Sequence, residues 1–179
     1  VSVTSPVSMQ LTLNDVPLNE PVSISFFGST MEKITLLYPI RGKVAAIDAN
    51  GGKLTVVDYN NVSRVVDLGQ QPTFVQNSRL LAGIGAVKVG DRVEVTTGPD
   101  GKVYVQVAVA ARKSVMTYDT YSQQLILRRT AQDEKTNYTF FADAYIHKGT
   151  EIVSPTSLYN LDAMIYTVDG IIMELETLT

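Results

Sequence analysis

Apolar and polar residues alternate along residues 87–109 of the chain. The apolar positions share one parity and are all valines: Val87, Val89, Val93, Val95, Val103, Val105, Val107 and Val109. Alternation of this kind is typical of a strand with one buried face. Pro99-Asp100-Gly101 separates the two runs, and it has turn chemistry because proline presets its own backbone angle and glycine accepts positive φ. The pattern therefore predicts a β-hairpin.

The first 13 residues predict another two-faced strand. The apolar residues occupy odd positions, with Ser5 as the exception: Val1, Val3, Val7, Met9, Leu11 and Leu13. Pro6 marks an edge position or a break in this strand. Residues 22–26 alternate valine, isoleucine and phenylalanine with serine and predict a second strand. Residues 31–38 fit either a strand or a short helix.

From residue 41 the pattern predicts a series of short strands at 43–48, 54–59, 62–68 and 73–76. Asn50-Gly51 lies between the first two, and Asn-Gly is the strongest short hairpin signal. Residues 77–86 contain Leu80, Leu81 and Ile84, enough for one apolar turn that closes a barrel end. The hairpin at 87–109 would complete this unit.

Residues 111–179 repeat the pattern at an offset of 71 positions, from Asp48 to Asp119. Apolar residues and turn residues then coincide without a gap, as in Leu54 with Leu125 and Val93 with Met164. Asp169-Gly170 matches Asp100-Gly101 at an offset of 69, so the last hairpin loop is shorter. Short strands separated by glycine, asparagine and aspartate indicate an all-β fold. We expect an N-terminal strand segment at 1–38 and two small antiparallel β-barrels at 39–110 and 111–179.

Three motifs carry a resemblance to a known group of modules. They are G-K-V-x-x-I-D-x-x-x-x-K-L-T-V at residues 42–56, V-K-V-G-D-R-V-E-V at 87–95 and D-G-K-V at 100–103. Together they resemble the small OB-like β-barrels found in tandem in bacterial secreted and surface-layer-associated proteins. The resemblance covers residues 41–110 well and the second unit loosely, where Leu161-Asp162-Ala163-Met164 replaces G-D-x-V. It implies two tandem OB-like barrels, an extracellular or cell-surface setting and a binding or structural role, with no catalytic residue.

Composition narrows the function classes. Of 179 residues, 45% are hydrophobic, which is too many for a disordered tail. The net charge is −3 and no basic run exceeds Arg128-Arg129, so we expect no nucleic-acid partner. Cysteine is absent, which excludes disulfides, thiolate metal sites and cysteine nucleophiles. No apolar stretch is long enough to span a bilayer, and the start at Val1 fits a processed secreted protein or a trimmed chain.

The candidates for chemistry are few. His147 is the only histidine, but no nucleophile motif lies near it, so we expect an exposed side chain beside Lys148. Six aspartates lie beside predicted turns, where carboxylates accept backbone N–H groups. They are Asp48, Asp91, Asp100, Asp119, Asp162 and Asp169. We therefore expect no enzyme activity and no cofactor.

Two groups of residues are candidate ligand sites. Asp48, Asn50 and Asp58 form a weak calcium candidate, although the loop lacks a third oxygen ligand and the closing glutamate. Tyr118 and Tyr121 flank the first hairpin of the second unit and could stack on a sugar, although packing is the alternative. The sequons at Asn61 and Asn137 weakly indicate exposed loops.

The strand at 1–13 carries the main functional hypothesis. It could pair in cis at the edge of its own barrels, or add in trans to a sheet of the next subunit. A head-to-tail contact that does not close would build a filament. The sequence thus predicts a structural subunit of a bacterial extracellular filament or surface layer that assembles with itself. The alternative is a non-catalytic module that binds a carbohydrate or another envelope polymer.

Overall fold

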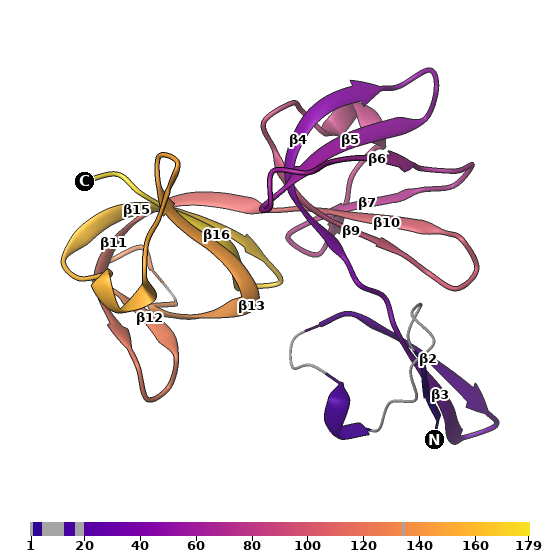
Figure 1. Cartoon of the computed structure of the whole chain (residues 1–179), viewed down its shortest axis with the longest axis horizontal. Helices are drawn as coiled ribbons and strands as arrows, with labels where there is room; N and C mark the ends of the chain where they lie inside the picture. The colour runs from indigo at the N-terminus through magenta and orange to yellow at the C-terminus, as the bar shows by residue number, and fades with distance from the viewer. Residues whose placement is uncertain (1, 5–12, 17–19, 134) are drawn as a thin grey trace. The chain divides into compact units, whose positions relative to one another are not determined.

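The regular elements of the described residues are β-strands and short 3-10 turns in a computed structural model (Figure 1). The structure describes residues 2–4, 13–16, 20–133 and 135–179. The described strands form three sheets, of three, seven and six strands. The expected all-β fold class is confirmed.

The chain divides into two compact units. Unit 1 comprises Val1–Val75 and Arg79–Val107, and unit 2 comprises Gln76–Ser78 and Ala108–Thr179. Unit 1 contains the three-stranded sheet together with almost all of the seven-stranded sheet. Unit 2 contains the six-stranded sheet.

The three-stranded sheet contains the N-terminal elements of unit 1. They are β1 (Ser2–Thr4), the 3-10 turn η1 (Leu13–Asp15), β2 (Val22–Phe27) and β3 (Thr30–Leu36). The sheet has the order β1-β3-β2, with β1 parallel and β2 antiparallel to β3. The segment at 31–38 is therefore mostly strand rather than helix. The expected strand at 1–13 is described only over Ser2–Thr4, and Leu13 lies in η1 instead.

The seven-stranded sheet has the order β6-β5-β4-β9-β10-β7-β8. Its elements are β4 (Ile40–Asp48), β5 (Lys53–Asp58), β6 (Ser63–Asp67), β7 (Thr73–Gln76), β8 (Arg79–Leu80), the 3-10 turn η2 (Ile84–Ala86), β9 (Arg92–Thr97) and β10 (Val103–Val107). Gly42 allows β4 to lie close to β5, because a Cβ there would lie 2.1 Å from the Val57 carbonyl oxygen. No other residue type fits that position without moving the backbone.

One hydrophobic core lies inside this sheet. Strands β4, β5, β6, β7, β9 and β10 all contribute buried residues to it, so the sheet curves around a single interior. Val93 and Val105 are fully buried, as their alternation predicts, whereas Val89 is exposed in the turn before β9. Leu81 and Ile84 pack against the core, as expected for a turn at its end, but Leu80 points to solvent.

Unit 2 contains a closed five-stranded barrel. Its elements are β11 (Val109–Asp119), β12 (Gln124–Leu127), β13 (Asn137–Lys148), β14 (Glu151–Ile152), the 3-10 turn η3 (Pro155–Ser157), β15 (Leu161–Val168) and β16 (Ile171–Thr177). The order β12-β11-β15-β16-β13 closes on itself because β12 also pairs with β13. The barrel is not wholly antiparallel as expected, because β13 and β16 run parallel.

Local chemistry explains the last hairpin of unit 2. Asp169 and Gly170 both have positive φ, of 51° and 76°, and they connect β15 directly to β16. Two positive φ values are typical of the type I′ turn, whose twist matches the flanking strands. The core of unit 2 includes fully buried Leu125, Leu158 and Ile172.

Neighbouring valines in β6 provide a matched test of the unit 1 core. Val66 is 8% exposed and packs in the core, whereas Val65 is 66% exposed. We expect Val66→Ala to lower the free energy of unfolding by about 2 kcal/mol, because each buried methylene contributes about 0.8 kcal/mol. Val65→Ala should change it by less than about 0.5 kcal/mol. Urea unfolding of both variants measures the difference, and equal effects would contradict the assigned strand face.

Candidate functional site

The hairpin of β2 and β3, here called the ribbon, has one polar and one apolar face. Ser23 pairs with Thr35 and Ser25 with Lys33 on the polar face. Ile24 pairs with Ile34 on the opposite face. This separation follows from the alternation of side chains along a strand.

The apolar face of the ribbon is buried near one end and exposed near the turn. Ile34 and Leu36 are buried. On this face Ile24 and Phe26 are 43% and 58% exposed. Phe27, which ends β2 at the turn and has the parity of the serines, is 80% exposed, and we call these three residues the ribbon patch. Clustered exposed apolar side chains of this size mark interaction sites, whereas single ones do not. The ribbon patch is therefore the leading candidate for a contact surface.

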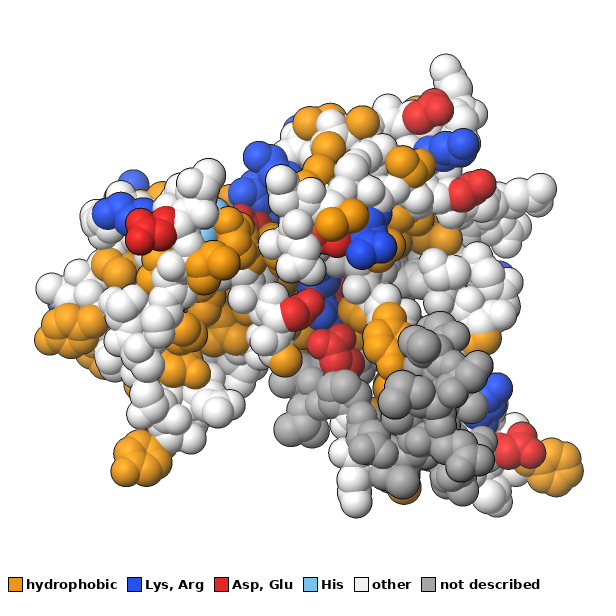
Figure 2. Space-filling model, in the orientation of Figure 1, with side chains coloured by type: hydrophobic (Ala, Val, Ile, Leu, Met, Phe, Trp, Pro, Cys, Tyr) orange, Lys and Arg blue, Asp and Glu red, His pale blue; other side chains and the backbone are white. Residues whose placement is uncertain are grey.

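The ribbon patch lies on a strand at the edge of its sheet. Among the strands that the structure describes, β2 pairs only with β3. Its six residues, VSISFF, include no charge and no proline. Proteins usually protect sheet edges with such residues, so an uncharged edge strand is open to pairing. Charged side chains are also sparse in the view of Figure 2, where hydrophobic side chains and the white atoms of the backbone and other side chains predominate.

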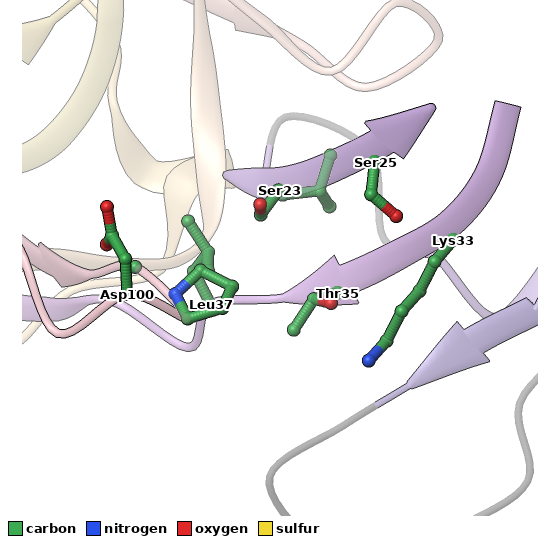
Figure 3. Close-up of a pocket in the computed structure, with 9 residues that line it drawn as sticks. Ser23, Ser25, Lys33, Thr35, Leu37 and Asp100 are labelled. Carbon is green, nitrogen blue, oxygen red and sulfur yellow. The ribbon is translucent and has the colours of Figure 1, made fainter. Parts of the chain in front are cut away.

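The polar face of the ribbon lines an open pocket of about 600 Å³ (Figure 3). Gly98, Pro99 and Asp100 complete it from the turn between β9 and β10. Lys33 and Asp100 provide opposite charges. The other residues that line the pocket are hydroxyl or apolar: Val22, Ser23, Ser25, Thr35 and Leu37.

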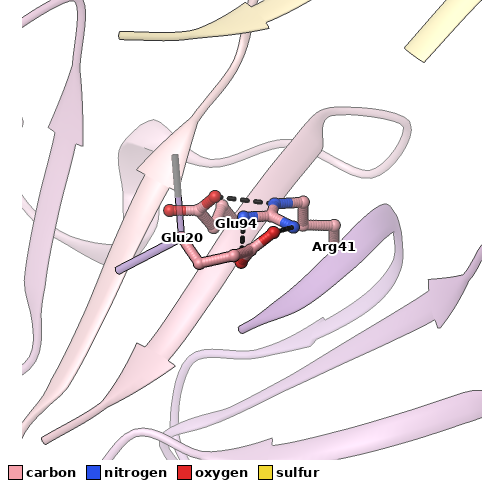
Figure 4. A network of polar contacts seen from close by, with 3 residues as sticks. All are labelled: Glu20, Arg41 and Glu94. Atoms are coloured by element: carbon pink, nitrogen blue, oxygen red, sulfur yellow. Dashed lines mark hydrogen bonds and ion pairs between the residues drawn. The ribbon is translucent and has the colours of Figure 1, made fainter. Parts of the chain in front are cut away.

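A buried ion-pair network connects the segment before β2 to the seven-stranded sheet (Figure 4). Arg41 of β4 donates from Nε to Glu94 Oε2 of β9 at 2.7 Å. Its Nη1 and Nη2 donate to the two carboxylate oxygens of Glu20 at 3.2 and 3.0 Å. The Arg41 side chain is 2% exposed, so all three groups depend on one another for compensation. The sequence pattern gave no indication of this network.

His147 is buried, and its expected position on the surface is wrong. Nδ1 lies 2.6 Å from the Gly149 carbonyl oxygen and Nε2 lies 2.8 Å from Glu174 Oε1. Tyr145 stacks on the ring with centroids 4.1 Å apart. The Gly149 carbonyl oxygen can only accept, so Nδ1 donates to it, while Nε2 bonds to Glu174. Alternation along β13 does not indicate this burial, because the adjacent Ile146 and His147 are both buried.

Most of the six predicted turn aspartates accept backbone N–H groups. The oxygen of Asp48 accepts from Gly51 at 2.8 Å, and those of Asp91, Asp100 and Asp119 accept from Lys88, Lys102 and Tyr121. The hydrogen bonds from Ser122 and Tyr121 lower the pKa of Asp119. Asp169 lies in the type I′ turn. Asp162 differs, because it lies within β15, where hydrogen bonds from Arg112 and Ser114 lower its pKa.

The structure does not bring the three calcium candidates together. Asp48 pairs with Lys53 at one end of the β4–β5 hairpin, and Asp58 pairs with Gly42 at the other. Asp58 accepts hydrogen bonds from Asn60, Val62 and Arg64. Desolvation opposes the ionised form of Asp58, but these hydrogen bonds outweigh it and lower its pKa. Asn50 lies in the exposed turn, and no group of three acidic or histidine side chains among the described residues is arranged for a metal ion.

The two candidate stacking tyrosines have different surroundings. Tyr118 packs edge-to-face on Phe140 with centroids 5.9 Å apart, beside the core of unit 2. Tyr121 is 98% exposed in the turn between β11 and β12. The two rings therefore form no common platform.

The proposed assembly strand is only partly described. Val3 lies in β1 and pairs with Ile34 of the same chain, and Leu13 is exposed in η1. The other members lie outside the described residues: Val1, Val7, Met9 and Leu11.

A comparison with known protein families and with curated proteins finds no match to this chain. Within the described residues, no helix has the length and apolar character needed to cross a bilayer. The geometry of the ribbon is therefore the main basis for a functional proposal.

The ion-pair network makes a testable contribution to stability. Arg41→Met leaves the carboxylate of Glu94 buried without its cation, so we expect it to cost about 3–5 kcal/mol. Arg64→Met is the matched control, since Arg64 pairs with Asp58 but is 51% exposed and should cost about 0–1 kcal/mol. Denaturant unfolding compares the two, and a similar small loss for both would show that Arg41 is dispensable.

Asp133 provides a prediction about pH. Hydrogen bonds from Lys113 and Thr130 lower the pKa of its carboxyl group from 3.8 to about 2. Because the pKa of Asp133 is lower in the folded than in the unfolded chain, its ionised carboxylate stabilises the fold at pH values above the unfolded pKa. This contribution is lost as the pH falls toward about 2. We expect Asp133→Asn to melt earlier than the parent at pH 7, and the difference in melting temperature to shrink between pH 4 and pH 2. A difference that stays constant with pH would exclude an electrostatic role.

Proposed function

We propose that this chain is a structural subunit of an extracellular assembly, a filament or surface layer, held by β-strand addition and apolar contacts. The observation that carries the proposal is the ribbon patch on an edge strand without charge or proline. The proposal assigns no reaction, cofactor or nucleic-acid partner to the chain.

The edge of β2 explains why strand addition is the favoured kind of contact. An edge strand has unpaired backbone N–H and C=O groups that a second strand can satisfy. The exposed side chains of Ile24 and Phe26 then gain apolar burial in the same contact. Strand β1 (Ser2–Thr4) pairs with the other edge of β3 in cis, so among the described strands of this sheet β2 is the edge that is left for a partner. Addition of the segment 1–13 in trans stays a prediction.

We further propose that both units are OB-like modules arranged in tandem. In unit 2 the first strand pairs with the second and fourth, and the third runs parallel to the fifth, as in OB barrels. Unit 1 supports the same order if β6 and β7 together count as the third strand, because β6 pairs with β5 and β7 with β10.

The element positions add independent support for the tandem arrangement. The 3-10 turns η2 and η3 begin at Ile84 and Pro155, which preserves the offset of 71 found in the sequence. Strands β5 and β12 begin at Lys53 and Gln124, again at that offset. The setting in a bacterial envelope rests on the resemblance of residues 42–103 alone.

A binding function for an envelope carbohydrate is the second candidate, and the pocket favours it. The hydroxyl groups of Ser23, Ser25 and Thr35, together with two opposite charges, provide donors and acceptors that suit a polar ligand. The pocket contains no aromatic ring for stacking on a sugar. Assembly therefore ranks first.

The assembly proposal predicts oligomers that depend on the ribbon patch. We expect the purified chain to form larger species as its concentration rises, in size-exclusion chromatography and negative-stain microscopy. The double variant Phe26→Ser with Phe27→Ser should shift the chain to the monomer, because it removes the apolar burial that drives contact. The control variant, Tyr121→Ser with Tyr159→Ser, removes equally exposed aromatic rings from unit 2 and should leave the oligomers unchanged.

A monodisperse monomer at every concentration would contradict the assembly proposal. Retention of that monomer on a column of immobilised envelope polysaccharide, lost on Lys33→Ala, would instead support the carbohydrate-binding alternative.

A further inference from the structure

We propose that the occupant of the β2 edge is the β2 strand of a second copy of this chain, antiparallel across a two-fold axis at Ile24. This inference rests on the proposed function and specifies one of its contacts, because a two-fold contact closes a dimer and a filament or layer then needs a second contact between dimers. Joining two ribbons in this way would give one continuous sheet with the order β1-β3-β2-β2-β3-β1.

The sequence of β2 matches itself under this symmetry. A two-fold axis at Ile24 places Val22 opposite Phe26 of the partner and Ser23 opposite Ser25 of the partner. Apolar side chains therefore meet apolar side chains on one face, and hydroxyl groups meet on the other. A shift by one residue would place each serine on the apolar face, which disfavours the neighbouring registers. A foreign strand would need no such internal symmetry in β2.

The charges around β2 permit the same contact. A two-fold axis brings each residue close to its own copy, so a charged side chain near the axis would meet a like charge. None of the six residues of β2 is charged. The nearest preceding charge, Glu20, is already paired with Arg41.

The ribbon patch would gain most from this contact. Ile24 of each copy lies at the axis, and Phe26 covers Val22 of the other copy. Aromatic and β-branched residues are favourable partners across strands. Phe27, the last residue of β2, would lie opposite Pro21 of the partner, which directly precedes its β2. The exposed side chains of one copy are thus complementary to those of the next without any rearrangement of the ribbon.

A single cysteine tests the register directly, because the chain has no cysteine of its own. In Ile24→Cys the two cysteines would face each other, and opposed residues in antiparallel strands lie at Cα distances of about 4.5–5.5 Å, within the range of a disulfide. Ile152→Cys is the matched control, with the same substitution at a 78% exposed site in β14. We expect mild oxidation to convert most of the Ile24→Cys chain to a covalent dimer, and little of the control.

A charge swap tests the symmetry independently. Ile24→Lys places two ammonium groups at the axis and should abolish the β2 contact while each copy stays folded, since Ile24 is partly exposed. Ile24→Glu should do the same. An equimolar mixture of the two variants should restore the contact, because opposite charges then meet. Analytical ultracentrifugation measures all three samples.

The outcomes separate this inference from the proposed function. If the parent assembles but Ile24→Cys links no better than the control, another surface is used and the inference is wrong. A disulfide that forms only when Ser2→Cys is combined with Ile24→Cys would mean that β1 of a neighbouring copy occupies the edge of β2. This result would also overturn the two-fold contact. A parent chain that never associates would overturn the inference and the assembly proposal together.

Discussion

The arrangement of unit 1 depends on the ion pairs that the buried guanidinium of Arg41 forms. It bonds to Glu94 on the adjacent strand β9 and to both oxygens of Glu20 just before β2. One guanidinium therefore pairs with two carboxylates, and loss of Arg41 removes the cation to which both of them bond in a poorly solvated position. Through Glu20, the same network fixes the point from which the ribbon begins. The presentation of β2 thus depends on an electrostatic contact with the seven-stranded sheet rather than on apolar packing alone.

The two faces of the ribbon explain why two functions compete for it. The serine, threonine and lysine side chains of one face line a pocket, whereas the other face carries Ile24 and Phe26 of the ribbon patch. A strand edge belongs to both faces, so pairing at β2 leaves the polar face accessible. Assembly and ligand binding are therefore compatible in principle, but only assembly makes use of the uncharged edge.

The alternation of apolar and polar residues predicts the strands from the sequence, and the buried valines of β9 and β10 follow it closely. Val89 departs from it because Asp91 accepts the Lys88 N–H and forms a turn there. The parallel pairing of β13 with β16 could not be predicted, since alternation specifies faces and not partners. The Arg41 network joins residues 21 and 53 positions apart, and no local pattern records such distances. His147 could not be placed by alternation, because it and the adjacent core residue Ile146 are both buried.

The connection between β6 and β7 distinguishes the two units. Residues 68–72 interrupt the strand in unit 1, whereas β13 is a single strand in the corresponding part of unit 2, where its register with β16 shifts between Phe140 and Tyr145. The core residues Val66 and Phe74 lie on the strands that flank the interruption, not within it, while Leu68 directly follows β6. Extra residues between Gly69 and Pro72 would thus lengthen a surface loop at a small entropic cost. Unit 1 can therefore diverge by insertion at this point, whereas unit 2 accommodates extra residues there as an irregularity within a paired strand.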